Sequence, residues 1–365
     1  MRLSTLLPAL GCLACALAAA RTRADDVPPA DPRACTAITA DAERLACYDR
    51  AMGRAAPTAH SPLKTPPVRS PTPQTLDDQL RYARAEPLQA PTAPLSLLDS
   101  RWELSPQSKL GPFHVRAYKP VYLLPAFYTS RTNQTPSSPA SGHTVARTEG
   151  LDKLESKFQL SLKTKIWQGM FGDNGDLWMG YTQTSHWQVY NSDISRPFRE
   201  TNYEPEAILA FRTNYDVFGW KGRLLGVGFD HQSNGRADPL SRSWNRVVFD
   251  LGLEREGWTL MLRPWIRVPE SRRNDDNPDI ADYLGRGDLL LVHDWGSGHE
   301  LAVMLRHSLR GGDRSHGAVQ VDWAFPIHNE LRGHVQIFSG YGESLIDYNH
   351  RATYLGLGVS MLEWY

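Results

Sequence analysis

Short runs of alternating apolar and polar or small residues recur from about residue 110 to the end of the chain. In the last run, Leu355, Leu357, Val359 and Met361 alternate with two glycines and a serine. Successive side chains of a strand point to opposite faces, so this run predicts a strand with one apolar face. Such a strand suits the wall of a transmembrane barrel, although a strand packed on a soluble core would look similar. The repetition of the pattern favours the barrel.

About twelve such runs are separated by turns rich in Gly, Asn, Asp and Ser. An even number is typical of bacterial single-chain barrels with both ends on the periplasmic side. Closure also pairs every backbone group, as a hydrocarbon environment demands. The sequence therefore predicts an all-β transmembrane antiparallel β-barrel of about twelve strands within residues 111–365. The runs lie near 113–127, 154–168, 175–190, 203–214, 222–233, 243–254, 257–268, 282–294, 299–308, 316–326, 331–341 and 352–363.

The N-terminal residues have a different character. Residues 1–24 combine Arg2, a mainly apolar stretch and small residues near the end, which predicts a secretory signal peptide. A lipoprotein signal, with Cys12 or Cys15 as the lipidated residue, is the alternative. After the signal the chain has no long apolar run, so we expect no transmembrane helix. The formal net charge is zero, which argues against nucleic acid as a partner.

Residues 25–110 are predicted to form a periplasmic extension. Cys35 and Cys47 are the only cysteines after the signal, and in an exported protein we expect them to form one local disulfide around a small helical turn. Residues 55–94 are rich in Pro, Ser, Thr and Ala, which predicts an extended linker without a core of its own.

The candidate chemistry lies in residues 231–245. His231 and Ser233 are two positions apart on a predicted strand, so they share a face, and Asn245 lies at the start of the next strand. A serine nucleophile, a histidine base and an amide that orients the base are the parts of a hydrolytic triad. The alternative is three unrelated polar residues at a membrane interface.

Side-chain alternation also predicts where this triad points. Leu225, Val227 and Phe229 share the face of His231 and Ser233, and Asn245 likewise lies on the apolar face of its strand. The triad is therefore expected on the lipid-facing wall. If the N-terminus is periplasmic, the triad lies at the outer-leaflet end of these two strands, at the level of lipid ester bonds.

Four segments closely resemble the outer-membrane phospholipase A family. They are HQSNGRADPLSRSWN (231–245), SRPFRETNYEPE (195–206), DDNPDI (275–280) and SGYGESLIDYN (339–349). The resemblance implies a twelve-stranded barrel in the outer membrane of a Gram-negative bacterium. It also implies hydrolysis of the acyl esters of membrane phospholipids, dependence on Ca²⁺, and activation by formation of a homodimer.

The same resemblance assigns roles to individual residues. Ser233 corresponds to the nucleophile, His231 to the base and Asn245 to the orienting residue. A catalytic calcium is implied at the Arg236 carbonyl and Ser241, with Ser195 of the partner subunit, and a further calcium position at Asp238 and Asp276. For the acidic residues Asp275, Asp276 and Asp279, a solvated outer loop is an equal alternative.

Gln183 is a polar residue in the middle of the apolar stripe of residues 175–190. It matches the dimer-interface glutamine of the family, and an interchain hydrogen bond would satisfy an amide that faces lipid. The alternative is a tolerated interfacial glutamine.

Two other functions compete with hydrolysis in the membrane. A non-catalytic pore or structural barrel is the first, but Arg246, Asp250 and Glu254 face the lumen and are expected to pair and plug it. A secreted soluble lipase is the second, and it is disfavoured because no G-x-S-x-G motif surrounds Ser233.

Overall fold

The computed structural model of the protein describes residues 31–53 and 96–364. These two parts are separate units, and each is described by itself. The expected signal peptide (1–24) and the whole of the proline-rich linker (55–94) lie outside the described residues.

The first unit is small and helical. A 3-10 helix η1 (Pro32–Ala37) precedes helix α1 (Asp41–Ala51), and a disulfide joins Cys35 to Cys47. The cross-link connects the two helices, and the Cys35 side chain is fully buried. The disulfide expected from the sequence is therefore present.

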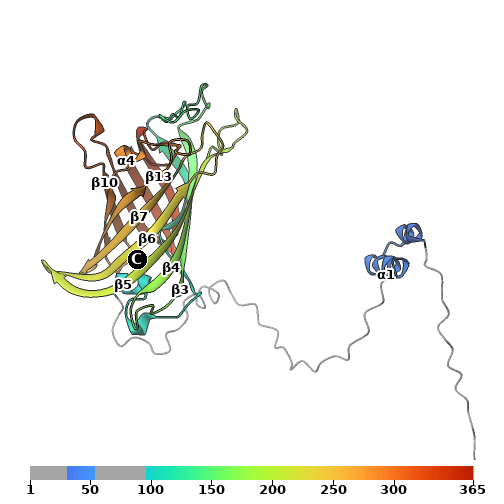
Figure 1. Ribbon diagram of the computed structural model, residues 1–365, viewed down its shortest axis with the longest axis horizontal. Coiled ribbons are helices and arrows are strands. Elements are labelled where there is room, and N and C mark those ends of the chain that lie inside the picture. The colour runs from blue at the N-terminus through green and yellow to red at the C-terminus, as the bar shows by residue number, and fades with distance from the viewer. Residues whose placement is uncertain (1–30, 54–95, 365) are drawn as a thin grey trace, which may run out of the picture. The chain divides into compact units, whose positions relative to one another are not determined.

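The second unit is a closed antiparallel β-barrel (Figure 1). Twelve long strands follow one another around the wall, and β3 closes the ring by pairing with both β2 and β4. The predicted all-β barrel of about twelve strands is confirmed. The strands are β2 (Val121–Thr129), β3 (Leu154–Trp167), β4 (Asp176–Trp187), β5 (Phe198–Val217), β6 (Trp220–Ser233), β7 (Ser243–Arg255), β8 (Trp258–Val268), β9 (Gly287–Asp294), β10 (Glu300–His307), β11 (Gly317–His328), β12 (Leu331–Tyr341) and β13 (Arg351–Leu362).

Two predicted runs are not continuous strands. The run 113–127 is divided into a short strand β1 (Val115–Ala117), which pairs with β3, and β2, which begins after Pro120. Proline has no N–H to donate to a ladder, which suits it to such a break. The run 282–294 begins in helix α4 (Ile280–Tyr283), and its strand starts only at Gly287.

Helix α3 (Leu97–Trp102) belongs with the barrel, although its residues were expected in the extension. Leu98 and Trp102 are buried against Trp178 and Leu224 of the wall, which follows from their bulk and apolarity. Burial of a leucine side chain alone contributes about 1.5–3 kcal/mol. The backbone N–H of Leu98 also donates to a Glu254 carboxylate oxygen, at 2.5 Å. The 3-10 helix η2 (Pro106–Ser108) then leads into β1.

The two faces of the wall differ as the alternation predicted. On β6, Leu225 and Phe229 are 43% and 48% exposed, whereas Leu224 and Asp230 are fully buried. On β13, Leu355 and Leu357 are exposed, whereas Ser360 is buried. The outer wall is thus apolar, and the inner wall is polar. Among residues 31–53 and 96–364, no helix has the length and apolarity needed to cross a bilayer.

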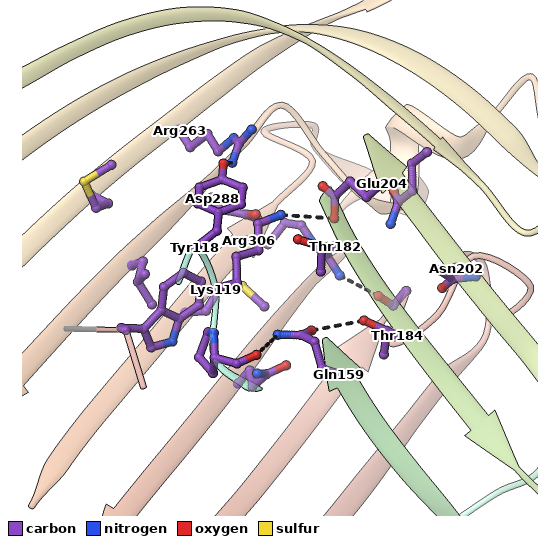
Figure 2. A pocket seen from close by; sticks show the side chains of 18 of the residues that line it. Tyr118, Lys119, Gln159, Thr182, Thr184, Asn202, Glu204, Arg263, Asp288 and Arg306 are labelled. Carbon is purple, nitrogen blue, oxygen red and sulfur yellow. Dashed lines mark hydrogen bonds and ion pairs between the residues drawn. The ribbon is translucent and has the colours of Figure 1, made fainter. Parts of the chain in front are cut away.

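Ion pairs line the lumen. Arg246 lies 2.7 Å from Asp230 and 3.2 Å from Glu204, and Lys119 lies 3.0 Å from Glu204. The expected lumenal charges Asp250 and Glu254 also have cationic partners, Arg263 at 3.6 Å and Arg223 at 3.3 Å. Figure 2 shows several of these side chains around an internal cavity of about 260 Å³. Charges removed from water in this way are stable only when paired, and their network disfavours an open pore.

Candidate active site

The β6–β7 ladder sets His231 directly opposite Asn245. His231 Nδ1 lies 2.8 Å from Asn245 Oδ1. Because the amide oxygen only accepts, the imidazole donates this bond, which leaves Nε2 as the ring's free base. Both side chains are on the face of exposed Phe229, away from the lumenal pair Asp230 and Arg246. The base and its orienting amide therefore face outward.

Ser233 is the last residue of β6 and lies across from Ser243 in the register. It shares the outward face with His231. Within the described residues, no hydrogen bond joins Ser233 to His231. Catalytic hydrogen bonds are often long in ligand-free enzymes and shorten when substrate binds. The shared face of Ser233 and His231 is therefore what supports their pairing as nucleophile and base.

Glu270 is a fourth side chain at this site that sequence reasoning missed. Its Oε1 accepts a hydrogen bond from Asn245 Nδ2 at 3.1 Å. This contact fixes which end of the amide faces His231. Partial burial raises the pKa of Glu270 above its ordinary value, and the bond from Asn245 opposes that shift. Glu270 follows β8, 25 residues after Asn245, and no motif spacing connects the two.

Asn234 holds the loop after Ser233 in shape. Its backbone N–H donates to the Arg242 carbonyl at 3.0 Å, and its side chain donates to the Leu240 carbonyl at 2.8 Å. Gly235 follows with φ +60°, and a Cβ there would lie 3.2 Å from the Tyr203 ring. Glycine fits both the left-handed backbone and the close approach. The loop that carries Arg236, Asp238 and Ser241 is thus fixed at its base.

The predicted metal residues are distributed over three loops. Ser241 donates to Asp276 Oδ2 at 2.6 Å, so the β6–β7 and β8–β9 loops meet. Asp238 and Asp276 lie together, with His143 of the β2–β3 loop between them. Ser195 has φ +63° in the β4–β5 loop, and within this chain's described residues no hydrogen bond joins it to Arg236 or Ser241. A backbone carbonyl and a serine hydroxyl are donors that fit a hard cation such as Ca²⁺.

The acidic segment 275–279 is folded rather than freely solvated. Asp275 accepts from Arg267 at 2.6 Å, and Asp279 accepts from the Tyr348 hydroxyl at 2.6 Å. Side-chain exposure is 12% for Asp275 and 18% for Asp276. Burial raises the pKa of Asp279. These contacts contradict the alternative of a solvated acidic loop.

Gln183 of β4 lies on the outer wall beside exposed Met179 and opposite exposed Leu160. Its amide oxygen accepts from the Tyr181 hydroxyl at 3.1 Å, and its nitrogen donates to Ser185 Oγ at 3.4 Å. Within the described part of the chain, these bonds leave one proton of the amide nitrogen without an acceptor.

The family model described as Phospholipase A1 matches residues 98–361. The chain belongs to the phospholipase A1 family. It is 39% identical to a putative phospholipase A1 of Neisseria meningitidis in an alignment of 347 residues that covers 89% of each chain. It is 40% identical to phospholipase A1 of Escherichia coli over 251 residues, 69% of this chain and 82% of that protein.

Solved structures agree with this assignment. Outer membrane phospholipase A of E. coli is 38% identical, with a TM-score of 0.62, over 69% of this chain and 95% of that one. The Salmonella typhi outer membrane phospholipase, a dimer with bound calcium, is 38% identical with a TM-score of 0.63, over 70% and 96%. The family and barrel fold predicted for this phospholipase A1 relative are confirmed.

Proposed function

We propose that this phospholipase A hydrolyses the acyl esters of phospholipids at the outer leaflet of the outer membrane, with a Ser233–His231–Asn245 triad that needs Ca²⁺ and a homodimer. The observation that carries the proposal is the outward direction of His231 and Asn245, beside an exposed apolar wall. A base that faces lipid can act only on a substrate that arrives from the bilayer.

Each residue has a definite part in the reaction. Ser233 Oγ attacks the ester carbonyl while His231 Nε2 takes the hydroxyl proton, and the ring returns this proton to the departing lysolipid alcohol. Water then cleaves the resulting acyl-enzyme with His231 again as base, releasing a fatty acid. Asn245 holds the tautomer that leaves Nε2 free. A neutral amide also avoids the cost of a bare carboxylate on a lipid-facing wall.

The Arg236 carbonyl, Ser241 and Ser195 of the partner subunit would hold the catalytic Ca²⁺. When bound, this ion would polarise the ester carbonyl and stabilise its developing negative charge. The calcium in the S. typhi dimer supports the proposal. Asp238 and Asp276 form the second predicted metal position.

The test is an assay of fatty-acid release from phospholipid–detergent mixed micelles by wild type and Ser233→Ala, with Ca²⁺ present. Hydrolysis by the wild type alone supports the proposal. Conductance across planar bilayers without hydrolysis would favour the pore instead.

We also propose that the N-terminal extension is periplasmic, since an even strand number leaves both barrel ends on one side.

Glu270 is expected to act as a positioning residue for the triad. Its hydrogen bond holds Asn245 in place. Loss of such a bond is expected to cost about 1–1.5 kcal/mol of transition-state stabilisation, or roughly five- to tenfold in rate. Glu270→Ala should lower kcat by that factor with little change in KM, and Glu270→Gln should restore most of it.

Glu270→Gln keeps an acceptor oxygen for Asn245 Nδ2, so a loss confined to Glu270→Ala would assign the effect to this hydrogen bond. Glu149→Ala, in the β2–β3 loop, is the control for a carboxylate at the same end of the barrel. Full kcat in Glu270→Ala would reject the role.

Gln183 is proposed to bind its counterpart across the dimer. Gln183→Ala removes an amide that keeps one unbonded proton within the described residues, and it should lower calcium-stimulated cross-linking and activity together by severalfold. Leu305→Ala, which truncates an exposed side chain on the opposite wall (β10), is the matched control. Cross-linking at the wild-type level in Gln183→Ala would contradict a role of Gln183 in the dimer interface.

A further inference from the structure

The β8–β9 loop contains a tight turn with two arginines at its tip. The Asn274 N–H donates to the Ser271 carbonyl at 2.9 Å, which closes a β-turn over the four residues from Ser271 to Asn274. Arg272 and Arg273 occupy the two central positions of this turn, and both are exposed. Two guanidinium groups are thus accessible from outside the protein at the tip of the turn.

Contacts on both sides hold this turn next to His231 and Asn245. Before the turn, Glu270 accepts from Asn245 Nδ2 at 3.1 Å. After it, Asn277 Oδ1 accepts from the first N–H of β7 at 3.0 Å. In the wall, Asn245 lies opposite both His231 and Val268. Because adjacent strands are about 4.8 Å apart, the end of β8 lies about 10 Å from His231. A lipid whose ester reaches the triad therefore has its head group within reach of the turn.

The two tip arginines have no ion pair or hydrogen bond through their side chains within the described residues, in contrast to two neighbouring arginines. Arg267 donates to Asp275 at 2.6 Å. Arg236 donates to two backbone carbonyls of β5, at 3.3 and 3.5 Å. Within the described part of the chain, the charge of Arg272 and Arg273 is therefore not compensated by a bound partner.

The turn lies just beyond the apolar surface of the wall. On β8, Ile266 is 63% exposed and shares the outward face with Val268. The turn follows directly after this strand, at its outer end. At this level of a bilayer the acyl chains give way to phosphate groups, and long cationic side chains are typical there.

We propose that Arg272 and Arg273 bind the phosphate group of the phospholipid that is attacked by Ser233, and thereby select lipids whose head group has a net negative charge. This inference rests on the proposed function, because it concerns the substrate of the same site. A guanidinium group is permanently charged and can donate two parallel N–H bonds to phosphate oxygens. In a zwitterionic lipid the ammonium group competes for the same phosphate, so such a lipid should bind less tightly.

Binding of the phosphate would also orient the ester. In a phospholipid the phosphate lies only a few bonds from the ester carbonyls, so a fixed phosphate limits where a carbonyl can lie relative to Ser233 Oγ. The acyl chain on the apolar wall would supply the second point of attachment. Restriction of the substrate in this way favours the reactive geometry before any bond is made.

The test compares hydrolysis of phosphatidylglycerol, phosphatidylcholine and dioleoylglycerol, which has no phosphate, by the full-length protein in neutral detergent micelles with excess Ca²⁺. The wild type should prefer phosphatidylglycerol. Arg272→Gln and Arg273→Gln should each lower kcat/KM for phosphatidylglycerol, relative to that for dioleoylglycerol, by about fivefold, as expected for one cation near an anionic surface. The double variant should lose at least about tenfold, mainly through KM, because the interaction already exists in the bound ground state.

Arg351→Gln is the matched control. Arg351 is also an exposed arginine, at the outer end of β13 on the other side of the ring. This control changes the net charge of the protein by the same amount and should keep the wild-type ratio of the two rates. Arg272→Lys keeps the charge but loses the paired donors, so it should recover part of the loss. Added NaCl should reduce the preference of the wild type more than that of the double variant.

A binding measurement keeps the proposal testable without hydrolysis. Ser233→Ala retains the turn, and its affinity for phosphatidylglycerol in the same micelles should fall when Arg272→Gln and Arg273→Gln are added to it. Weaker binding without hydrolysis of any lipid by the wild type would refute the hydrolytic proposal and keep the phosphate site.

Two results would overturn the inference. An unchanged lipid ratio and unchanged affinity in the variants that lack both arginines would mean that these arginines do not bind the phosphate of the substrate. They would then be left to bind phosphates of other outer-leaflet lipids, which the micelles do not contain. An equal loss in Arg351→Gln would mean that the net charge of the protein, rather than the turn, attracts the anionic lipid.

Discussion

Ser233→Ala is expected to lower the rate of fatty-acid release by at least about a thousandfold, a loss of about 4 kcal/mol of transition-state stabilisation. Alanine has no atom that could form the acyl-enzyme, and His231 then has no proton to accept. The barrel should survive, because Ser233 ends β6 on the outer face and its side chain makes no hydrogen bond within the described residues. Circular dichroism and resistance to heat in detergent would check the fold.

Ser243→Ala is the matched control for this variant. Ser243 lies directly across the ladder from Ser233. Its backbone N–H, rather than its hydroxyl, donates to Asn277 at 3.0 Å. The control should keep wild-type activity. Equal losses in both variants would mean that any truncation here disturbs the wall, and retained calcium-dependent hydrolysis in Ser233→Ala would remove Ser233 as the nucleophile.

Chelation of calcium is expected to have the second largest effect, a loss of at least about a hundredfold in hydrolysis. Removal of one oxyanion-stabilising group typically costs about 10²–10³ in kcat, and the cation is proposed to supply that stabilisation. Among the described residues, no lysine or arginine donates a hydrogen bond to the side chains of Ser233, His231 or Asn245. Added Ca²⁺ should restore the rate. Mg²⁺ should not, because it demands a tighter octahedral shell.

The readouts for this prediction are the rate in EGTA and the rate after titration back with Ca²⁺ or Mg²⁺. Ser241→Ala should raise the Ca²⁺ concentration needed for half-maximal activity, since it removes one proposed ligand. A rate that is unaffected by EGTA would mean that hydrolysis proceeds without the cation and would remove Arg236, Ser241 and Ser195 as its ligands.

Alternation along the strands was the most informative part of the sequence. It predicted the number of strands, the apolar wall and the outward face of His231, because side-chain direction follows from position alone. The residues at which strands begin and end were harder to predict from the sequence. Helix α4 and the break at Pro120 interrupt runs whose apolar content continues, and burial of Leu98 in the barrel depends on wall residues more than 70 positions away.

The parts of the site that sequence alone left out share one physical reason. Glu270 meets Asn245, and His143 meets Asp238, only because loops of different hairpins converge at one end of the barrel. Neither pairing has a characteristic spacing. In contrast, His231, Ser233 and Asn245 belong to one hairpin, so their register could be inferred directly.

The central claim is that Ser233 is a nucleophile that faces lipid, and its most direct measurement is the location of a covalent adduct. Wild type in mixed micelles with Ca²⁺ would be treated with a long-chain alkyl fluorophosphonate, which reacts with activated serines, and then digested and analysed by mass spectrometry. We predict one adduct, on the peptide that contains Ser233, formed in step with the loss of hydrolysis. Loss of hydrolysis with the adduct on another residue, or full labelling with hydrolysis unchanged, would contradict the account.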